Sequence, residues 1–228
     1  MGEDNATYQG RVSMESFAVR YSAAAVRQRS VLCVGLDPTP SHIPPGFGNS
    51  KSLENWESYL YHIVQAAAPR VPVIKPQSAY YEAMGPEGIK LLKSVVAWGR
   101  QAGLLVILDA KRSDIGATME AYARSLTWLG VDACTFVPYL GSTFRPGDKE
   151  KSPCWMDWLA TGKCAISMVR TSNPEADQLQ DLKLEDGQLV YEYMATLVRS
   201  WNNVVSQQTK ETGCVGAVVG ATWPEEAV

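Results

Sequence analysis

A run of charged residues follows directly on an apolar segment in the middle of the chain. Residues 104–115 read LLVILDAKRSDI, so five apolar residues lead into Asp109, Lys111, Arg112 and Asp114. Side chains two positions apart on an extended chain point to the same side, which predicts that Asp109 and Lys111 face one space. A carboxylate and an ammonium group held together at the mouth of a buried strand are suited to proton transfer and to stabilising a developing charge.

Lys75 ends another apolar segment and can reach the same space. The spacing therefore predicts an alternating array of Lys75, Asp109, Lys111 and Asp114, in which each lysine lowers the pKa of the aspartate beside it. Burying such an array costs several kcal/mol per ion, so it is a poor device for stability. A surface ion-pair network, or a structural network that fills the end of the fold, would also fit this spacing. A catalytic role is favoured because perturbed charges in a cleft mark active sites.

The elements that must position these residues alternate along the chain. Apolar segments fit for strands alternate with amphipathic patterns fit for helices, which indicates βαβ units and a parallel sheet. The expected strands are residues 31–36, 71–74, 104–108, 133–137, 164–168 and 215–219. The expected helices are residues 17–27, 56–68, 87–102, 117–129 and 190–205.

Polar residues gather after these strands, as they do at the carboxyl ends of barrel strands. The first strand is followed by GLDPTP and not by the glycine-rich turn of a dinucleotide-binding sheet, which favours the barrel. We therefore expect an α/β fold of the TIM (β/α)₈ type, with about six of its eight strands within these 228 residues. Residues 1–12 are expected to form a flexible tail and residues 13–228 a single barrel domain.

Composition excludes several classes of protein. The net charge of −3 offers no basic field for nucleic acid, and no apolar run approaches the ~20 residues of a membrane helix. Five cysteines without CxxC spacing are typical of a reduced, cytoplasmic compartment. His42 and His62 lack ligand spacing, so neither a metal site nor histidine-based catalysis is expected.

Five motifs together resemble one family. They read VGLDP, IKPQSAYYEAMGPEG, LDAKRSDIGAT, RTSNPEADQLQ and VVGATWPEE. In this combination the sequence resembles the orotidine 5′-monophosphate decarboxylases, in the branch with an elongated first loop. The resemblance implies a carbon–carbon lyase of pyrimidine biosynthesis that needs no cofactor and converts orotidine 5′-monophosphate (OMP) to uridine 5′-monophosphate (UMP).

The resemblance also implies roles for the charged residues. Asp109 would face the carboxylate of the substrate, and Lys111 would protonate C6 as CO₂ leaves. Lys75 would hold Asp109 and contact the ribose, and Asp37 would bind a ribose hydroxyl.

The remaining roles concern a partner subunit and a loop. By resemblance, Asp114 would reach across the interface of a homodimer into the neighbouring site, with Ile115 and Thr118 close by. Ser172 would hydrogen-bond the pyrimidine ring from a loop that closes over the substrate.

Two departures leave alternatives open. The glycine-rich and Gly-Arg elements with which the family grips the phosphate do not occur in these residues, so we expect the chain alone to bind the nucleotide weakly and to have impaired activity. A Mg²⁺-dependent keto-sugar-phosphate decarboxylase or lyase of the same superfamily is a second interpretation, which loss of activity in EDTA would favour. A third interpretation is a non-catalytic remnant of the barrel. A cooperative thermal transition whose melting temperature rises with a nucleotide monophosphate would argue against it.

Overall fold

The computed structural model describes residues 15–39, 43–48, 52–141, 153–210 and 213–227. The predicted tail, residues 1–12, lies outside these ranges, as does His42. The described residues form alternating strands and helices, as the sequence predicts.

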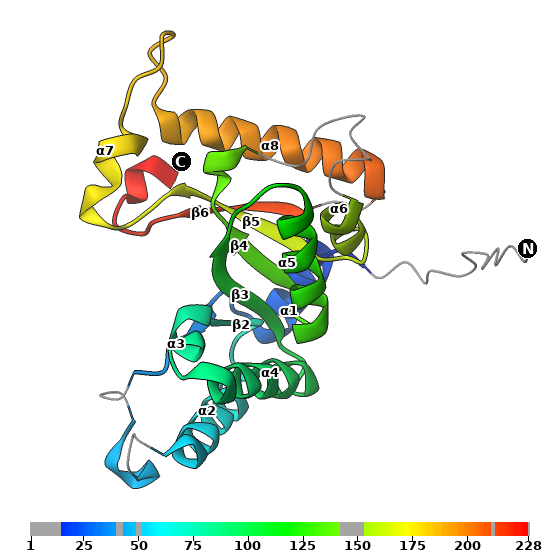
Figure 1. Ribbon diagram of the computed structural model, residues 1–228, viewed down its shortest axis with the longest axis vertical. Coiled ribbons are helices and arrows are strands. Elements are labelled where there is room, and N and C mark those ends of the chain that lie inside the picture. The colour runs from blue at the N-terminus through cyan, green and yellow to red at the C-terminus, as the bar shows by residue number, and fades with distance from the viewer. Residues whose placement is uncertain (1–14, 40–42, 49–51, 142–152, 211–212, 228) are drawn as a thin grey trace, which may run out of the picture.

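A single sheet of six parallel strands forms the centre of the fold, in the order in which the strands occur along the chain. The strands are β1 (Cys33–Leu36), β2 (Val73–Pro76), β3 (Leu105–Arg112), β4 (Ala133–Phe136), β5 (Cys164–Arg170) and β6 (Val215–Val219). They curl into part of a (β/α) barrel (Figure 1). Within the described ranges, no strand pairs with the outer edge of β1 or of β6.

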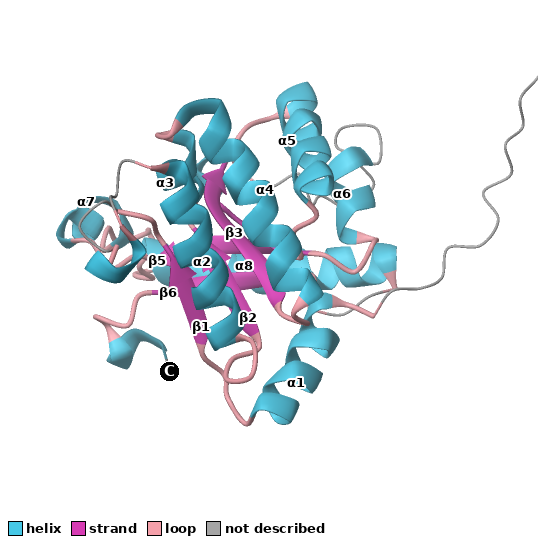
Figure 2. Cartoon of the chain, turned by 90° about the horizontal axis from the view of Figure 1, so that it is seen from below, coloured by secondary structure: helices cyan, strands magenta, loops and turns pink. Residues whose placement is uncertain are grey.

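Helices surround the outside of the curled sheet (Figure 2). They are α1 (Phe17–Gln28), α2 (Leu53–Ala67), α3 (Ser78–Glu82), α4 (Gly85–Gln101), α5 (Gly116–Leu129), α6 (Pro153–Leu159), α7 (Asp177–Gln180) and α8 (Val190–Thr209). Helix α4 packs on β2 and β3, while α8 packs on β5 and β6. Parallel strands need a crossover connection on a face of the sheet, and helices supply it here. The carboxyl ends of all six strands therefore lie at the same edge of the sheet.

Two apolar clusters hold this arrangement together. The larger one fills the space between the sheet and the helices, and includes Val95 and Val106, which are fully buried. The smaller one lies at the amino ends of the strands, where Phe17 of α1 packs with Val73 and Leu105. Helix α1 therefore covers the amino-terminal end of the sheet and leaves the opposite end free for the site.

The sequence located all six strands, with its largest error at the end of β3. Strand β6 has the predicted bounds, whereas β3 continues to Arg112 and not only to residue 108. Three short helices, α3, α6 and α7, were not expected. Each has seven residues or fewer, too few to show a helical period.

Candidate active site

Three of the charged residues meet at the carboxyl ends of β2 and β3. The ammonium of Lys75 lies 2.7 Å from Oδ2 of Asp109, and that of Lys111 lies 2.7 Å from Oδ1 of the same carboxylate. The side chain of Asp109 is 12% exposed, whereas those of Lys75 and Lys111 are 33% and 45% exposed. The aspartate is thus held inside the fold, while both ammonium groups remain accessible at its mouth.

Lys111 reaches Asp109 through an irregular backbone and not through the regular strand that the sequence predicts. Leu108 pairs with Cys134 and Arg112 pairs with Phe136, so four steps along β3 match only two steps along β4. Within this bulge Lys111 has φ of 48°, in the left-handed region. That conformation costs a non-glycine residue about 1–2 kcal/mol, and such strain is typical of functional sites.

Thr135 of β4 supports the bulge, and its role was not predicted. Its hydroxyl accepts a hydrogen bond from the backbone N–H of Lys111 at 3.0 Å and donates one to Oδ1 of Asp109 at 2.9 Å. The threonine is buried, and its hydroxyl supplies an acceptor for the backbone N–H of Lys111 within the bulge. A hydroxyl residue in the otherwise apolar segment ACTF was the available signal.

The surroundings of Asp109 favour its ionised form. Burial alone would raise the pKa of this carboxyl group, but hydrogen bonds from Lys111, Lys75 and Thr135, together with the charge of Lys75, outweigh burial and lower the pKa below its usual value of 3.8. Two ammonium groups around one carboxylate leave the cluster with a net charge of +1. The site can therefore attract an anionic substrate while keeping a fixed negative charge beside it.

Asp114 lies apart from these three residues in the structure. Its carboxylate accepts a hydrogen bond from the backbone N–H of Ile115 at 2.8 Å, and no ion pair of the described residues includes it. Ile115 is 66% exposed, and Thr118 is exposed as well. The predicted array of four is thus present as a cluster of three within this chain.

Asp37 follows β1 at the same end of the sheet, where it is exposed. Close to it, the fully buried Tyr81 donates a hydrogen bond to the carbonyl of Leu36 at 3.2 Å. Burial, and then the charge of Asp37, raise the pKa of Tyr81. The tyrosine therefore stays neutral and fixes the backbone from which Asp37 extends.

Ser172 is exposed on the loop after β5, and the loop after β6 supports it. A Cβ atom on Gly220 would lie 3.0 Å from the nitrogen of Ser172, so only glycine allows the two backbones to pack this closely. The indole of Trp223 donates a hydrogen bond to the carbonyl of Thr171 at 3.3 Å. The two loops thus form one unit at the carboxyl end of the sheet.

Arg170 anchors this unit from below. The residue is only 1% exposed. Its guanidinium donates to Glu226 and Asp181, each at 2.5 Å, and lies over the rings of Trp223 and Tyr191. Two ion pairs and two aromatic rings therefore hold Arg170 between the loops after β5 and β6.

The described residues contain no cluster of metal-ligating side chains and no helix suited to a membrane. In those ranges, no group of three or more histidine, cysteine, aspartate or glutamate side chains is placed to hold a metal ion. No helix in the described part of the chain is long and apolar enough to span a membrane.

A charged cluster at the carboxyl ends of parallel barrel strands, on a strained backbone, defines the class of the protein as a barrel enzyme. Within this class, the family model of the orotidine 5′-phosphate decarboxylases and HUMPS proteins matches residues 30–228. The chain belongs to this family.

Individual relatives agree with the family match. The chain is 39% identical to the orotidine 5′-phosphate decarboxylase of Rhodopirellula baltica, over 94% of this chain and 74% of the relative. It is 40% identical to that of Roseiflexus castenholzii, over 92% of this chain and 70% of the relative. The solved OMP decarboxylase of Leishmania donovani superimposes with a TM-score of 0.74 at 31% identity, over 92% of this chain and 73% of that chain.

Proposed function

We infer that this chain is an OMP decarboxylase, which forms UMP and CO₂ in pyrimidine biosynthesis. The observation that carries this inference is the cluster of Lys75, Asp109 and Lys111, found at the carboxyl end of the sheet in a member of this family. The relatives described above are decarboxylases of OMP by name, which favours this reaction over the keto-sugar-phosphate chemistry.

The cluster fits the chemistry that this reaction demands. When the bond between C6 and the carboxylate breaks, its electron pair stays on C6, where no π system delocalises it. We propose that the ammonium of Lys111 stabilises this charge and transfers one of its protons to C6 as CO₂ departs. A fixed cation at the place where negative charge develops lowers the barrier because no solvent has to reorganise.

Lys75 and Asp109 position the proton donor. Lys75 and Thr135 also bind the carboxylate of Asp109. These bonds keep the carboxylate in place if the side chain of Lys111 moves toward the substrate. A substrate carboxylate placed beside Asp109 would be repelled by it. Because CO₂ is neutral, this repulsion is relieved when the carboxylate leaves. We propose that Asp37 binds the ribose and that Ser172 binds the pyrimidine ring, as their positions at the carboxyl end of the sheet allow.

We further propose that the protein is a cytoplasmic homodimer in which Asp114, Ile115 and Thr118 face the neighbouring site. Exposed apolar side chains on the loops after β3 and β4 support a shared surface, with Ile115 66% and Tyr139 78% exposed. Free thiols at Cys33, Cys134 and Cys164 are compatible with a reducing compartment. Sedimentation velocity of Ile115→Glu tests the dimer, because a charge at the interface should shift the protein to the monomer, and an unchanged sedimentation coefficient would oppose it.

The direct test of the activity is release of labelled CO₂ from OMP that carries the label in its carboxylate. We expect CO₂ and UMP in equal amounts, at a rate that EDTA does not change. A rate abolished by EDTA and restored by Mg²⁺ would favour the keto-sugar-phosphate alternative. Every variant has the same 228 residues apart from its substitution. Weak binding of the nucleotide therefore affects the rates of all variants alike.

A further inference from the structure

Arg112 is a charged residue at the end of β3 that lies outside the cluster around Asp109. It follows Lys111 directly, but its side chain turns to the helices outside the sheet, whereas that of Lys111 turns to Asp109. The guanidinium of Arg112 donates a hydrogen bond to Glu82 of α3 at 2.6 Å. It also lies over the ring of Tyr122 of α5, 5.1 Å from the ring centroid. Arg112 thus ties the end of β3 to two helices.

The bulge of β3 ends at Arg112, which pairs with Phe136 of β4. The carbonyl of Arg112 accepts a hydrogen bond from the backbone N–H of Val137 at 3.1 Å. Lys111, one residue earlier, has the left-handed φ of 48°. A non-glycine residue keeps such a conformation only where the surrounding structure leaves it no other. The fixed position of Arg112 is therefore suited to hold Lys111 in its conformation.

Glu82 offers Arg112 a partner on a firm support. It is the last residue of α3, and Tyr81 before it is fully buried. Helix α3 begins directly after Gln77, which forms a bridge with Asp109 of β3. The helix is therefore joined to β3 at both of its ends, through Gln77 at its start and through Glu82 at its last residue.

The ion pair of Arg112 and Glu82 is too exposed to contribute much to stability. The two side chains are 30% and 42% exposed. Ion pairs at such positions add little to the free energy of unfolding, because water and salt screen the charges. A planar guanidinium between a carboxylate and an aromatic ring nevertheless has a defined orientation. The pair is therefore expected to act on the geometry of the bulge more than on folding.

We propose that Arg112 is a positioning residue for Lys111. Its contacts with Glu82 and Tyr122 fix the end of the bulge, and the bulge holds the ammonium of Lys111 beside Asp109. Arg112 acts through the backbone of Lys111 and not by contact with Asp109. The proposal rests on the proposed decarboxylase function where the reaction rate is measured, but not where the bulge itself is measured.

Steady-state kinetics of Arg112→Met test the proposal, because methionine keeps an unbranched side chain and removes the contact with Glu82. We expect kcat for CO₂ release from OMP to fall roughly tenfold and KM to stay within about twofold, since a displaced proton donor slows the chemical step without weakening binding. Arg112→Lys keeps a cation that can pair with Glu82, and should recover most of the rate. The melting temperature should change by no more than about 4 °C. A kcat within about twofold of that of the active, unaltered protein would overturn the proposal.

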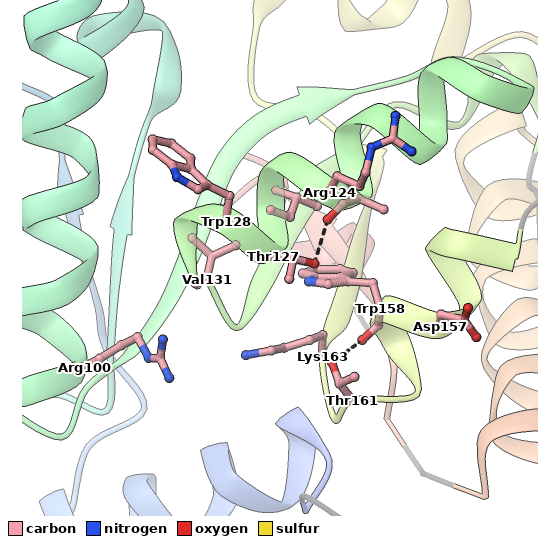
Figure 3. Close-up of a pocket in the computed structure, with 12 residues that line it drawn as sticks. Arg100, Arg124, Thr127, Trp128, Val131, Asp157, Trp158, Thr161 and Lys163 are labelled. Atoms are coloured by element: carbon pink, nitrogen blue, oxygen red, sulfur yellow. Dashed lines mark hydrogen bonds between the residues drawn. The ribbon is translucent and has the colours of Figure 1, made fainter. Parts of the chain in front are cut away.

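A matched arginine and the partner carboxylate locate the effect. Arg124 pairs with Glu120 at 3.7 Å within α5, and Figure 3 shows its side chain pointing away from the pocket beside this helix. Arg124→Met should therefore leave kcat within about twofold. Glu82→Gln should lower kcat about fivefold, and combining it with Arg112→Met should add nothing to the loss, as expected for two residues that act as a unit. Equal losses at the two arginines, or losses that multiply in the double variant, would refute the proposal.

Hydrogen exchange measures the bulge without any activity. The backbone N–H of Lys111 donates to the hydroxyl of Thr135 at 3.0 Å, so loosening of the bulge should speed its exchange. We expect peptides that contain this amide to exchange at least ~threefold faster in Arg112→Met, and peptides of β6 to be unchanged. Equal acceleration in both, or in neither, would overturn the proposal. If the unaltered protein releases no CO₂ from OMP but the exchange result holds, the proposed function fails and the role of Arg112 in holding the bulge stands.

Discussion

Two aspartates of this protein have almost the same ionic surroundings and opposite positions in the fold. Asp109 lies between Lys75 and Lys111 at the carboxyl ends of the strands, each at 2.7 Å. Asp132 lies between Arg20 at 2.7 Å and Lys163 at 3.2 Å, at the amino ends. Hydrogen bonds and nearby cations lower the pKa of both carboxyl groups against the effect of burial.

The two clusters differ in accessibility and in backbone strain. Around Asp132, the side chain of Lys163 is only 11% exposed, and the backbone N–H of Val106 donates to the second carboxylate oxygen at 3.0 Å. Around Asp109, Lys111 is 45% exposed and has the left-handed backbone of the bulge. An aspartate between two cations is therefore not in itself a mark of catalysis. An accessible cation on a strained backbone is the feature that separates the two clusters.

The largest effect is expected from removing the accessible cation. Lys111→Met should lower kcat by at least ~10⁴-fold, because the variant loses both the proton donor and the electrostatic stabilisation of the carbanion. Arg20→Met removes a cation from the other cluster and should leave kcat within about threefold. Measurement of CO₂ release by both variants checks the contrast, and similar losses in the two would remove the distinction between the clusters.

Removal of the structural carboxylate should act on stability instead. Asp132→Asn leaves Arg20 and Lys163 without their anion, and should lower the free energy of unfolding by about 3 kcal/mol, since breaking a buried ion pair leaves charge uncompensated. In a protein of this size the melting temperature should fall by roughly 6–12 °C. Urea unfolding measures the change. A decrease no larger than that of Asp109→Asn would show that the two aspartates are equivalent in stability.

A smaller effect is expected at the hydroxyl that joins Asp109 to the bulge. Thr135→Val keeps the shape but removes the hydrogen bonds to Asp109 and to the backbone of Lys111, which should lower kcat about tenfold. Thr135→Ser retains the hydroxyl and should restore most of the rate. If the valine and serine variants lose activity equally, the hydroxyl does not position the site.

The smallest effect is expected in the dependence of stability on pH. Because the pKa of Asp132 is lowered in the folded protein, the unfolded chain binds the proton first as the pH falls toward the usual value of 3.8. The stabilisation is therefore present above that value and is lost below it. Asp132→Asn should lose less stability between pH 5.5 and pH 3.5 than the unaltered protein, as measured by urea unfolding at the two values. An equal loss would show that Asp132 does not contribute to acid unfolding.

The sequence predicted the fold and the meeting of Lys75, Asp109 and Lys111, because apolar segments and the family motifs locate the strands and the residues at their ends. Apolar segments and their spacing locate strands such as β6, and the motif around Asp109 and Lys111 carries the resemblance to the family. The bulge in β3 could not be predicted, since it results from the pairing of β3 with β4. The cluster at Asp132 was missed because Arg20 is 112 residues away in the sequence.

Chemical restoration of the ammonium group tests the central claim about Lys111 most directly. Lys111→Cys should be inactive, and alkylation with 2-bromoethylamine places an ammonium at nearly the same distance from the backbone. Burial raises the pKa of the neighbouring Cys33 to about 11 although the charge of Lys75 lowers it, so this thiol should react slowly. The unaltered protein, treated in parallel, measures any effect at the other cysteines. We predict that CO₂ release from OMP returns by at least ~100-fold over Lys111→Cys once mass spectrometry shows residue 111 to be modified. Full modification without any return of activity would contradict the role of Lys111.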